Sequence, residues 1–333
     1  MSGYVAEGSG AEPVELKGMS PVRLTALLIF TQLPGVLAYT IALPLLAKMA
    51  GELAHDPASA YLAKMVSGIL GPAMALGALI AGILADRFDR RWLVMLYGAV
   101  FVASAIAPGF LKNIETIVAT RFVMGFAAAS LMATGLTMAG DYLPENRRAK
   151  TIGMLSAMNM VVSLSSMPIA GYVAGEGWRP AFLLYLAALP LLLLVLPSPL
   201  PAPQKAPAVG EAKAAGNWFS GMPIDLLAIA LGVGVILTVP GIYISFHLAT
   251  IGLGKPATVA LLMSSNSAMA AVFSAIFGKA LESSSQKAVF CGAFGIMALG
   301  LVLLSMAPGI ALAWPGLLLM GAGMGWLAPG MPA

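Results

Sequence analysis

Charged residues are scarce in this sequence: Asp, Glu, Lys and Arg make up 10% of the 333 residues, whereas hydrophobic residues make up 59%. Soluble globular domains carry about 25% charged residues, so the polar surface here is too small to cover a water-facing domain. The apolar residues also come in long runs, and a helix needs about 20 of them to cross a bilayer core about 30 Å thick. The sequence therefore predicts an all-α polytopic membrane protein embedded in a lipid bilayer.

Cysteine is nearly absent as well. The single residue, Cys291, excludes an internal disulfide, and its position inside an apolar run indicates an inert packed thiol. The 18 basic residues exceed the 14 acidic ones, but in a membrane chain basic residues mark cytoplasmic loops, so we expect no nucleic-acid partner. The first 20 residues contain no basic segment followed by a short apolar core, which argues against a cleavable signal peptide.

Residues that would carry enzyme chemistry are also missing from the sequence. It contains no His-rich metal cluster, no nucleophile elbow and no pair of carboxylates within an apolar run. We therefore expect no enzyme activity, no cofactor and no metal.

Ten apolar runs are long enough to be membrane spans. They lie at residues 23–47, 62–85, 92–111, 114–140, 151–174, 180–197, 223–249, 257–280, 288–307 and 310–328. Residues 198–222 between the sixth and seventh runs are rich in proline and too polar to fold alone, so we interpret them as a linker. We expect a cytoplasmic tail over 1–22, a six-helix unit over 23–197, the linker over 198–222 and a partial second unit of about four helices over 223–333.

The basic residues predict how the spans are oriented. With the N-terminus in the cytoplasm, the inside regions hold twelve basic residues: Lys17, Arg23, Arg87, Arg90, Arg91, Arg147, Arg148, Lys150, Lys205, Lys213, Lys279 and Lys287. The outside loops hold five, Lys48, Lys64, Lys112, Arg179 and Lys255. Cytoplasmic loops carry the excess of Lys and Arg, so we expect a multi-pass protein of the inner (plasma) membrane with a cytoplasmic N-terminus.

The two units repeat a local pattern. Glycine, acid and base recur at an offset of 196 residues, from Gly82, Asp86 and Arg91 to Gly278, Glu282 and Lys287. Both sets follow the second span of their unit, which indicates two parallel repeats. On that offset the second unit would extend about 60 residues beyond residue 333, enough for two more spans. We therefore expect a C-terminally incomplete chain; a native ten-span protein is the alternative.

Four motifs follow one another along the first unit. They are Gly82-x-x-x-Asp86-Arg87-x-Asp89-Arg90-Arg91; Arg121-x-x-x-Gly125; Pro144 followed by Arg147-Arg148-Ala149; and Pro168-x-x-Gly171 followed by Gly177-Trp178-Arg179-x-x-Phe182. In this order the chain resembles the major facilitator superfamily, although that family usually has a second glycine where Asp89 stands. The last motif resembles a degraded form of the fifth-helix motif of drug/proton antiporters. The resemblance implies a twelve-helix bundle, of which about ten helices are present, and a small-molecule substrate.

The loop of the first motif also has a physical interpretation of its own. Gly82 would let a neighbouring helix approach closely, and Asp86, just past a helix end, can accept hydrogen bonds from another helix or pair with Arg90. Together with Arg87 and Arg91 it forms a charge cluster that can be made and broken, as a gate requires. By resemblance, Asp86 would latch against an eleventh helix that this sequence does not contain. A basic loop that only sets topology is the alternative.

Arg121 lies about seven residues inside the expected span over 114–140. A charge in the bilayer interior costs several kcal/mol, so such a residue is a functional candidate. It could line a central cavity and bind an anion or relay a proton, or its long side chain could reach the outer interface. Gly125 and Ala129 follow at helical spacing, which favours a face packed on protein and hence the cavity.

Polar residues within the spans, Arg121 among them, form a wider set. The candidates for substrate binding or coupling are Gln32, Tyr39, Arg121, Asn159, Ser163, Tyr243, His247 and Asn266. Such residues also bond across helices simply to hold a bundle together, which is the alternative for each. Residues expected to serve helix packing are Gly125, Pro168, Gly171 and Gly175.

The leading functional hypothesis is a secondary active transporter of a small organic solute, acting by alternating access and as a monomer. The fifth-helix motif favours efflux. Proton coupling stays open: His247, or Asp141 paired with a basic neighbour, could carry a proton, and facilitated diffusion fits equally well. A truncated remnant or a membrane interaction protein without transport activity is the alternative.

Overall fold

A computed structural model of the chain describes residues 21–85, 87–143, 145–175, 177–191, 238–277 and 285–327. Throughout these ranges the regular secondary structure is helical, as the composition predicts. The linker over 198–222, the N-terminal tail over 1–20 and Asp86 lie outside the described residues. Of the second copy of the repeated pattern, Gly278 and Glu282 lie outside them too, whereas Lys287 lies in the helix Gln286–Ser305.

The first unit contains seven α-helices and three short 3-10 helices among its described residues. They are α1 (Pro21–Thr40), η1 (Leu43–Leu45), α2 (Leu46–Leu53), α3 (Pro57–Gly68), α4 (Leu70–Ala85), α5 (Arg90–Ile106), η2 (Ala107–Gly109), α6 (Ile114–Tyr142), α7 (Glu145–Ala174) and η3 (Arg179–Ala188). The described part of the second unit consists of a helix over 238–250 and of α10 (Pro256–Ala275), α12 (Gln286–Ser305) and α13 (Ile310–Leu327).

Seven helical segments among the described residues are long and apolar enough to cross a membrane. The helices α3 and α4 pass the same criterion together but are bent by 42° at their junction, as in a broken span or a re-entrant loop. The expected spans over 180–197 and 223–249 are described only in part, by η3 and by residues 238–250. The count of ten spans therefore stays a prediction.

Several helix ends follow directly from the local sequence. Asp56 caps α3, because its side chain accepts a hydrogen bond from the backbone of Ser59 and the Ser59 hydroxyl in turn accepts one from the Asp56 backbone. Asp89 caps α5 by accepting from the Arg91 backbone at 2.9 Å. Gly175 ends α7 with φ +41°, a left-handed conformation that a residue without Cβ adopts at little cost.

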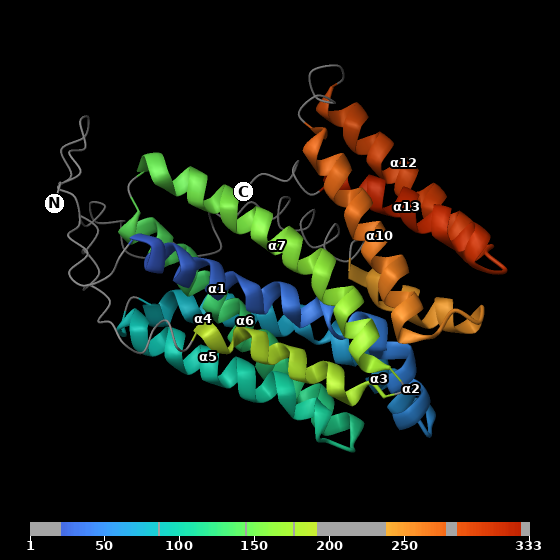
Figure 1. Cartoon of the computed structure of the whole chain (residues 1–333), viewed down its shortest axis with the longest axis horizontal. Coiled ribbons are helices and arrows are strands. Elements are labelled where there is room, and N and C mark those ends of the chain that lie inside the picture. The colour runs from blue at the N-terminus through green and yellow to red at the C-terminus, as the bar shows by residue number, and fades with distance from the viewer. Residues whose placement is uncertain are drawn as a thin grey trace, which may run out of the picture.

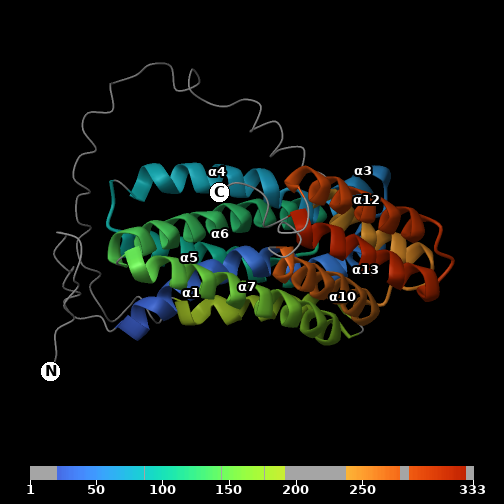
Figure 2. The same ribbon diagram turned by 90° about the horizontal axis from the view of Figure 1, so that it is seen from above.

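Two apolar cores divide the helices into two bundles (Figures 1 and 2). The larger core lies among α1, α3, α5, α6 and η3, and the smaller one lies among residues 238–250, α10, α12 and α13. The bundles meet mainly where α7 crosses α10, and Met167 of α7 belongs to the core of the second bundle. In both views α7 and α10 touch near the end of α7 and separate toward its beginning.

Small residues set the helix spacing at these crossings. A Cβ added to Gly171 would lie 2.5 Å from the Ala260 Cβ, and one added to Gly125 would lie 3.1 Å from the Ala73 Cβ, so α7–α10 and α6–α4 pack backbone to backbone. Pro168 lies inside α7, three residues before Gly171. The expectation for Gly82 differs: a Cβ added there would meet nothing within 4 Å, because this face of α4 is exposed in the described structure.

Candidate functional site

A cavity of about 250 Å³ lies between the two bundles. The first bundle contributes residues from α1, η1 and α7, and the second contributes residues from 238–244, α10 and α13. Its lining residues are Tyr39, Leu43, Met167, Thr238, Gly241, Ile242, Ile244, Met263, Asn266, Ser267, Leu317, Met320 and Met324. A cavity shared by two bundles changes shape when one bundle moves relative to the other.

A second cavity of about 320 Å³ lies beside the first, between α7, α10 and α13. It shares Asn266, Ser267 and Met324 with the first, which makes the two cavities neighbours. Its further lining residues include Ser163 of α7 and Ser274 of α10. Ser163 precedes Met167 along α7, and Ser274 follows Asn266 along α10, so the second cavity lies farther toward the end where these two helices separate.

Three of the sequence-predicted candidates line these cavities. Tyr39 lines the first, Ser163 the second and Asn266 both. The Asn266 Nδ2 donates a hydrogen bond to the Leu317 carbonyl at 2.8 Å, which fixes the amide between α10 and α13. Chain segments far apart in sequence thus bring these polar groups to one place.

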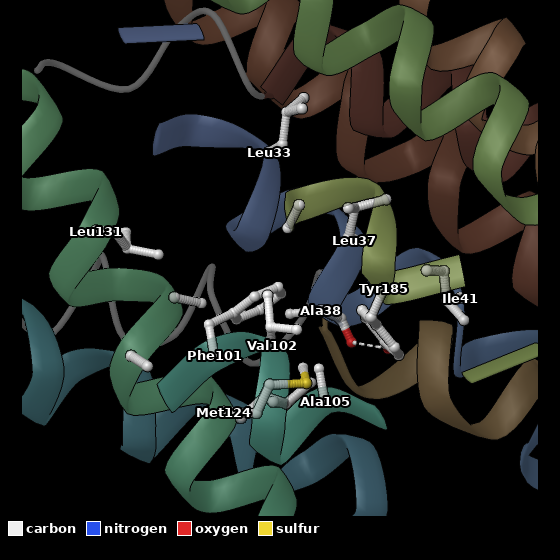
Figure 3. Packing of buried hydrophobic residues seen from close by; sticks show 14 of the residues in the cluster. Leu33, Leu37, Ala38, Ile41, Phe101, Val102, Ala105, Met124, Leu131 and Tyr185 are labelled. Carbon is white, nitrogen blue, oxygen red and sulfur yellow. Dashed lines mark hydrogen bonds between the residues drawn. The ribbon is translucent and has the colours of Figure 1, made fainter. Parts of the chain in front are cut away.

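Arg121 lies inside the first bundle and lines neither cavity. Its side chain is 0% exposed, and it donates hydrogen bonds to the Val66 carbonyl at 3.2 Å, to the Ala38 carbonyl and to the Tyr185 hydroxyl at 2.8 Å. Figure 3 shows Tyr185 turned toward Ala38 within this core. The guanidinium group therefore ties α6 to α1, α3 and η3 from within the bundle.

Four other candidates line neither cavity. Gln32 donates to the Met132 carbonyl at 3.2 Å, joining α1 to α6. The His247 Nε2 lies 2.8 Å from the Leu304 carbonyl. Tyr243 is half exposed, and the Asn159 Oδ1 on α7 is a buried acceptor for which the described structure provides no donor.

Arg90 of the first motif forms an ion pair with Asp141 of α6. From the sequence we expected Asp141 to pair with a basic neighbour but did not identify Arg90 as that neighbour. Arg90 is 6% exposed at the start of α5, and Asp141 lies near the end of α6. Arg87 is exposed, and Arg91 contributes its backbone N–H to the cap by Asp89. Asp89 therefore has a role of its own at the position where the family pattern has glycine. The partner predicted for Arg90, Asp86, lies outside the described residues.

The two bundles contact each other at one end of the molecule. We call this region the convergent end, and it consists of residues 43–64, 171–175, 177–179 and 242–260. The Ala47 backbone N–H donates to the Ser245 hydroxyl at 3.4 Å. The Lys64 ammonium group lies 5.2 Å from the centre of the Tyr243 ring. Both contacts join the first bundle to the helix over 238–250.

A polar cluster lies next to this region within the first bundle. Trp178 is fully buried, and its Nε1 donates to Glu52 at 2.8 Å, while Arg179 pairs with the same carboxylate at 3.4 Å. Sequence reasoning missed this contact because its partners lie 126 residues apart. It also missed the methionines of the cavities, since an apolar run gives no sign of which of its faces will be covered.

Known proteins resemble this chain in sequence and in fold. A gallate transporter of Pseudomonas putida is 30% identical over 168 residues, which are 47% of this chain and 37% of that protein. The 4-hydroxybenzoate transporter PcaK of Acinetobacter baylyi is 29% identical over 40% of this chain and 29% of its own length. The matches thus span less than half the length of these curated relatives.

Among solved structures, a bacterial homologue of the human lysosomal transporter Spinster, in an inward-facing and unoccupied conformation, superposes with a TM-score of 0.72 at 16% identity. It covers 94% of this chain and 75% of that one, and at this identity it supports the fold alone. The family model described as Major Facilitator Superfamily matches residues 28–333. On the strength of that match, which takes in both bundles and the cavities between them, the chain belongs to the Major Facilitator Superfamily of membrane transporters.

Proposed function

We propose that this protein moves a small organic solute across the plasma membrane by alternating access. The observation that carries the proposal is the arrangement of cavities between two bundles that touch at the convergent end and separate at the other. Rocking one bundle about the other would close the open end and free the contacts at the convergent end. A solute held between the bundles would then be exposed to the opposite side.

The positive residues support an assignment of the two sides. The start of α5, which carries Arg90 and Arg91, lies at the end where α7 and α10 separate (Figures 1 and 2). The twelve-to-five excess of basic residues favours assigning that end to the cytoplasm. On this proposal the described conformation is open toward the cytoplasm, and the N-terminus lies on the same side.

The direction of transport and its coupling form the finer part of the proposal. The fifth-helix pattern at Pro168 and Gly171 favours efflux with proton exchange. A second candidate is uptake by proton symport, since one of the solved structures of similar fold is that of a D-xylose-proton symporter. The ion pair between Arg90 and Asp141 and the imidazole of His247 are the groups we propose for coupling.

The experiment is solute exchange into proteoliposomes containing the purified full chain. Radiolabelled gallate, 4-hydroxybenzoate and D-xylose, the solutes named for the relatives, are tested with a pH gradient in either direction. Exchange above that of protein-free vesicles supports transport. Acceleration by an opposing proton gradient supports efflux, and acceleration by a parallel gradient supports symport. Stable insertion without exchange of any solute favours the remnant or interaction protein.

A covalent control links any flux to movement of the bundles. Cys291 is first replaced by serine, so that no native thiol competes. Ala47→Cys and Ser245→Cys are then introduced together, because the Ala47 backbone N–H already contacts the Ser245 side chain. Disulfide formation at this position should abolish exchange, and reduction should restore it. Exchange that persists in the oxidised protein would contradict alternating access.

A further inference from the structure

The cavities between the bundles are lined by sulfur and by small uncharged polar groups. Five methionines contribute to them: Met160, Met167, Met263, Met320 and Met324. The polar side chains of the first cavity are those of Tyr39, Thr238, Asn266 and Ser267. Among the described residues that line either cavity, none carries a formal charge.

This lining is unfavourable for an anion. Moving a carboxylate out of water costs several kcal/mol unless a cation or several donors replace its hydration. Arg121, a cation buried within the first bundle, lines neither cavity, and its donors are bonded to Val66, Ala38 and Tyr185. An uncharged solute needs no such compensation.

The lining also disfavours a sugar. A monosaccharide carries a hydroxyl on nearly every carbon, and each one buried without a partner costs about 1–3 kcal/mol. Four of the described residues that line the first cavity have polar side chains, and one of them, Asn266, already donates through Nδ2 to Leu317. A solute with one or two polar groups could form hydrogen bonds with these side chains and leave no polar group of its own unpaired.

Size and sulfur point to an aromatic ring. A cavity of about 150 Å³ suffices to hold benzene, so the 250 Å³ of the first cavity holds one ring with small substituents. Thioether sulfur makes favourable contacts at ring edges, and methionine adapts its shape to a flat ligand. Met167 and Met263 approach the cavity from opposite bundles, so a ring between them would contact both.

We propose that the first cavity binds an uncharged solute with a single aromatic ring. The ring lies between the methionine side chains, and the amide of Asn266 and the phenol of Tyr39 bond its polar substituent. The proposal rests on the transport function above, for which it names the substrate class, and it departs from the carboxylates named for two of the relatives.

The test compares two solutes of nearly equal shape. Binding of 4-hydroxybenzamide, which is uncharged, and of 4-hydroxybenzoate, which is an anion at neutral pH, is measured by calorimetry on the purified full chain. We expect the amide to bind at least about tenfold more tightly, because none of the described residues that line the cavity carries a charge to offset that of the benzoate. Equal or tighter binding of the benzoate overturns the proposal, as does failure of both solutes to bind at millimolar concentration.

Substitutions assign the binding to the cavity. Met263→Leu and Met324→Leu keep an apolar side chain of similar size but remove the sulfur. Each should lower the affinity for 4-hydroxybenzamide roughly two- to tenfold. Met306→Leu is the matched control, since Met306 is 69% exposed and lines neither cavity. Equal affinities in all three variants would place the amide elsewhere and overturn the proposal.

The binding measurement separates this proposal from the transport function. If the amide binds in the cavity but is not exchanged by proteoliposomes, the site assignment stands and transport is contradicted. If 4-hydroxybenzoate is exchanged but the amide neither binds nor competes, transport stands and the assignment of an uncharged aromatic solute is wrong.

Discussion

Gly171 of α7 lies directly against α10, where an added Cβ would stand 2.5 Å from the Ala260 Cβ and 2.7 Å from the Pro256 carbonyl oxygen. No side chain larger than hydrogen fits there without moving one of the two helices. This contact joins the bundles at the convergent end, and the cavities lie farther along the same helix pair.

Gly171→Leu should therefore force the bundles apart at the convergent end. We expect the disulfide between Ala47→Cys and Ser245→Cys to form much more slowly in this variant, because the two positions no longer meet. The rate of disulfide formation under mild oxidation measures the effect. Gly153→Leu is the control on the same helix, since a Cβ at Gly153 would meet nothing within 4 Å. Equal rates in both variants would show that the contact does not hold the bundles together.

The ion pair between Arg90 and Asp141 should be strongly coupled. Arg90 is almost fully buried and Asp141 is about a quarter exposed, so removal of either partner leaves the other charge without compensation. Asp141→Asn and Arg90→Met should each lower stability by about 1–3 kcal/mol. The double variant should lose clearly less than the sum of the two.

Denaturant unfolding of the four proteins in detergent provides this double-mutant cycle. If the losses of unfolding free energy in the two single variants add up to the loss in the double variant, the two residues do not interact and the ion pair is contradicted. If the double variant exchanges solute normally but no longer responds to a pH gradient, the pair also takes part in coupling.

Arg121 should act mainly through stability. Arg121→Lys keeps the charge but loses the fork of donors shared among Val66, Ala38 and Tyr185. We expect a loss of about 2–4 kcal/mol, and a loss of about 1 kcal/mol for Tyr185→Phe. Thermal unfolding in detergent measures both. If Arg121→Lys is as stable as the wild type but fails to exchange solute, Arg121 instead takes part directly in transport.

The cap of α3 should make stability depend on acidity. Hydrogen bonds from the backbone and side chain of Ser59 hold the pKa of Asp56 below its ordinary value of 3.8. A lowered folded-state pKa means that the stabilisation is complete above the ordinary value and disappears as the pH falls through the lowered one. The melting temperature of the wild type should exceed that of Asp56→Ala at neutral pH, and the difference should shrink below about pH 4. A difference independent of pH would contradict the ionised cap.

Much of the fold was predictable because membrane spans are defined by length and apolarity. The run over 114–140 corresponds to α6, and the run over 310–328 to α13, to within two residues. The bend between α3 and α4 was not predicted, since the run over 62–85 is continuously apolar across it. Hydropathy predicts that a segment lies in the membrane, but it does not predict whether the helix axis bends within it.

The site was predictable only in part. Tyr39, Ser163 and Asn266 stood out as polar residues in apolar runs, and they line the cavities. By the same criterion Arg121 and Gln32 stood out, but they bond within the first bundle. Whether a polar group faces a cavity or a neighbouring helix depends on rotation about the helix axis, which a continuous apolar run does not specify.

Alternating access requires that the second cavity be reachable from one side of the membrane at a time, and a single thiol can report that side. Ser274 lines this cavity, so Ser274→Cys in the Cys291→Ser protein provides a single thiol within it. The reagent is a membrane-impermeant maleimide, applied to inside-out and to right-side-out vesicles. We expect rapid reaction from the cytoplasmic side and little reaction from the outside. Reaction from the outside as fast as from the cytoplasm would contradict a cavity closed at the convergent end.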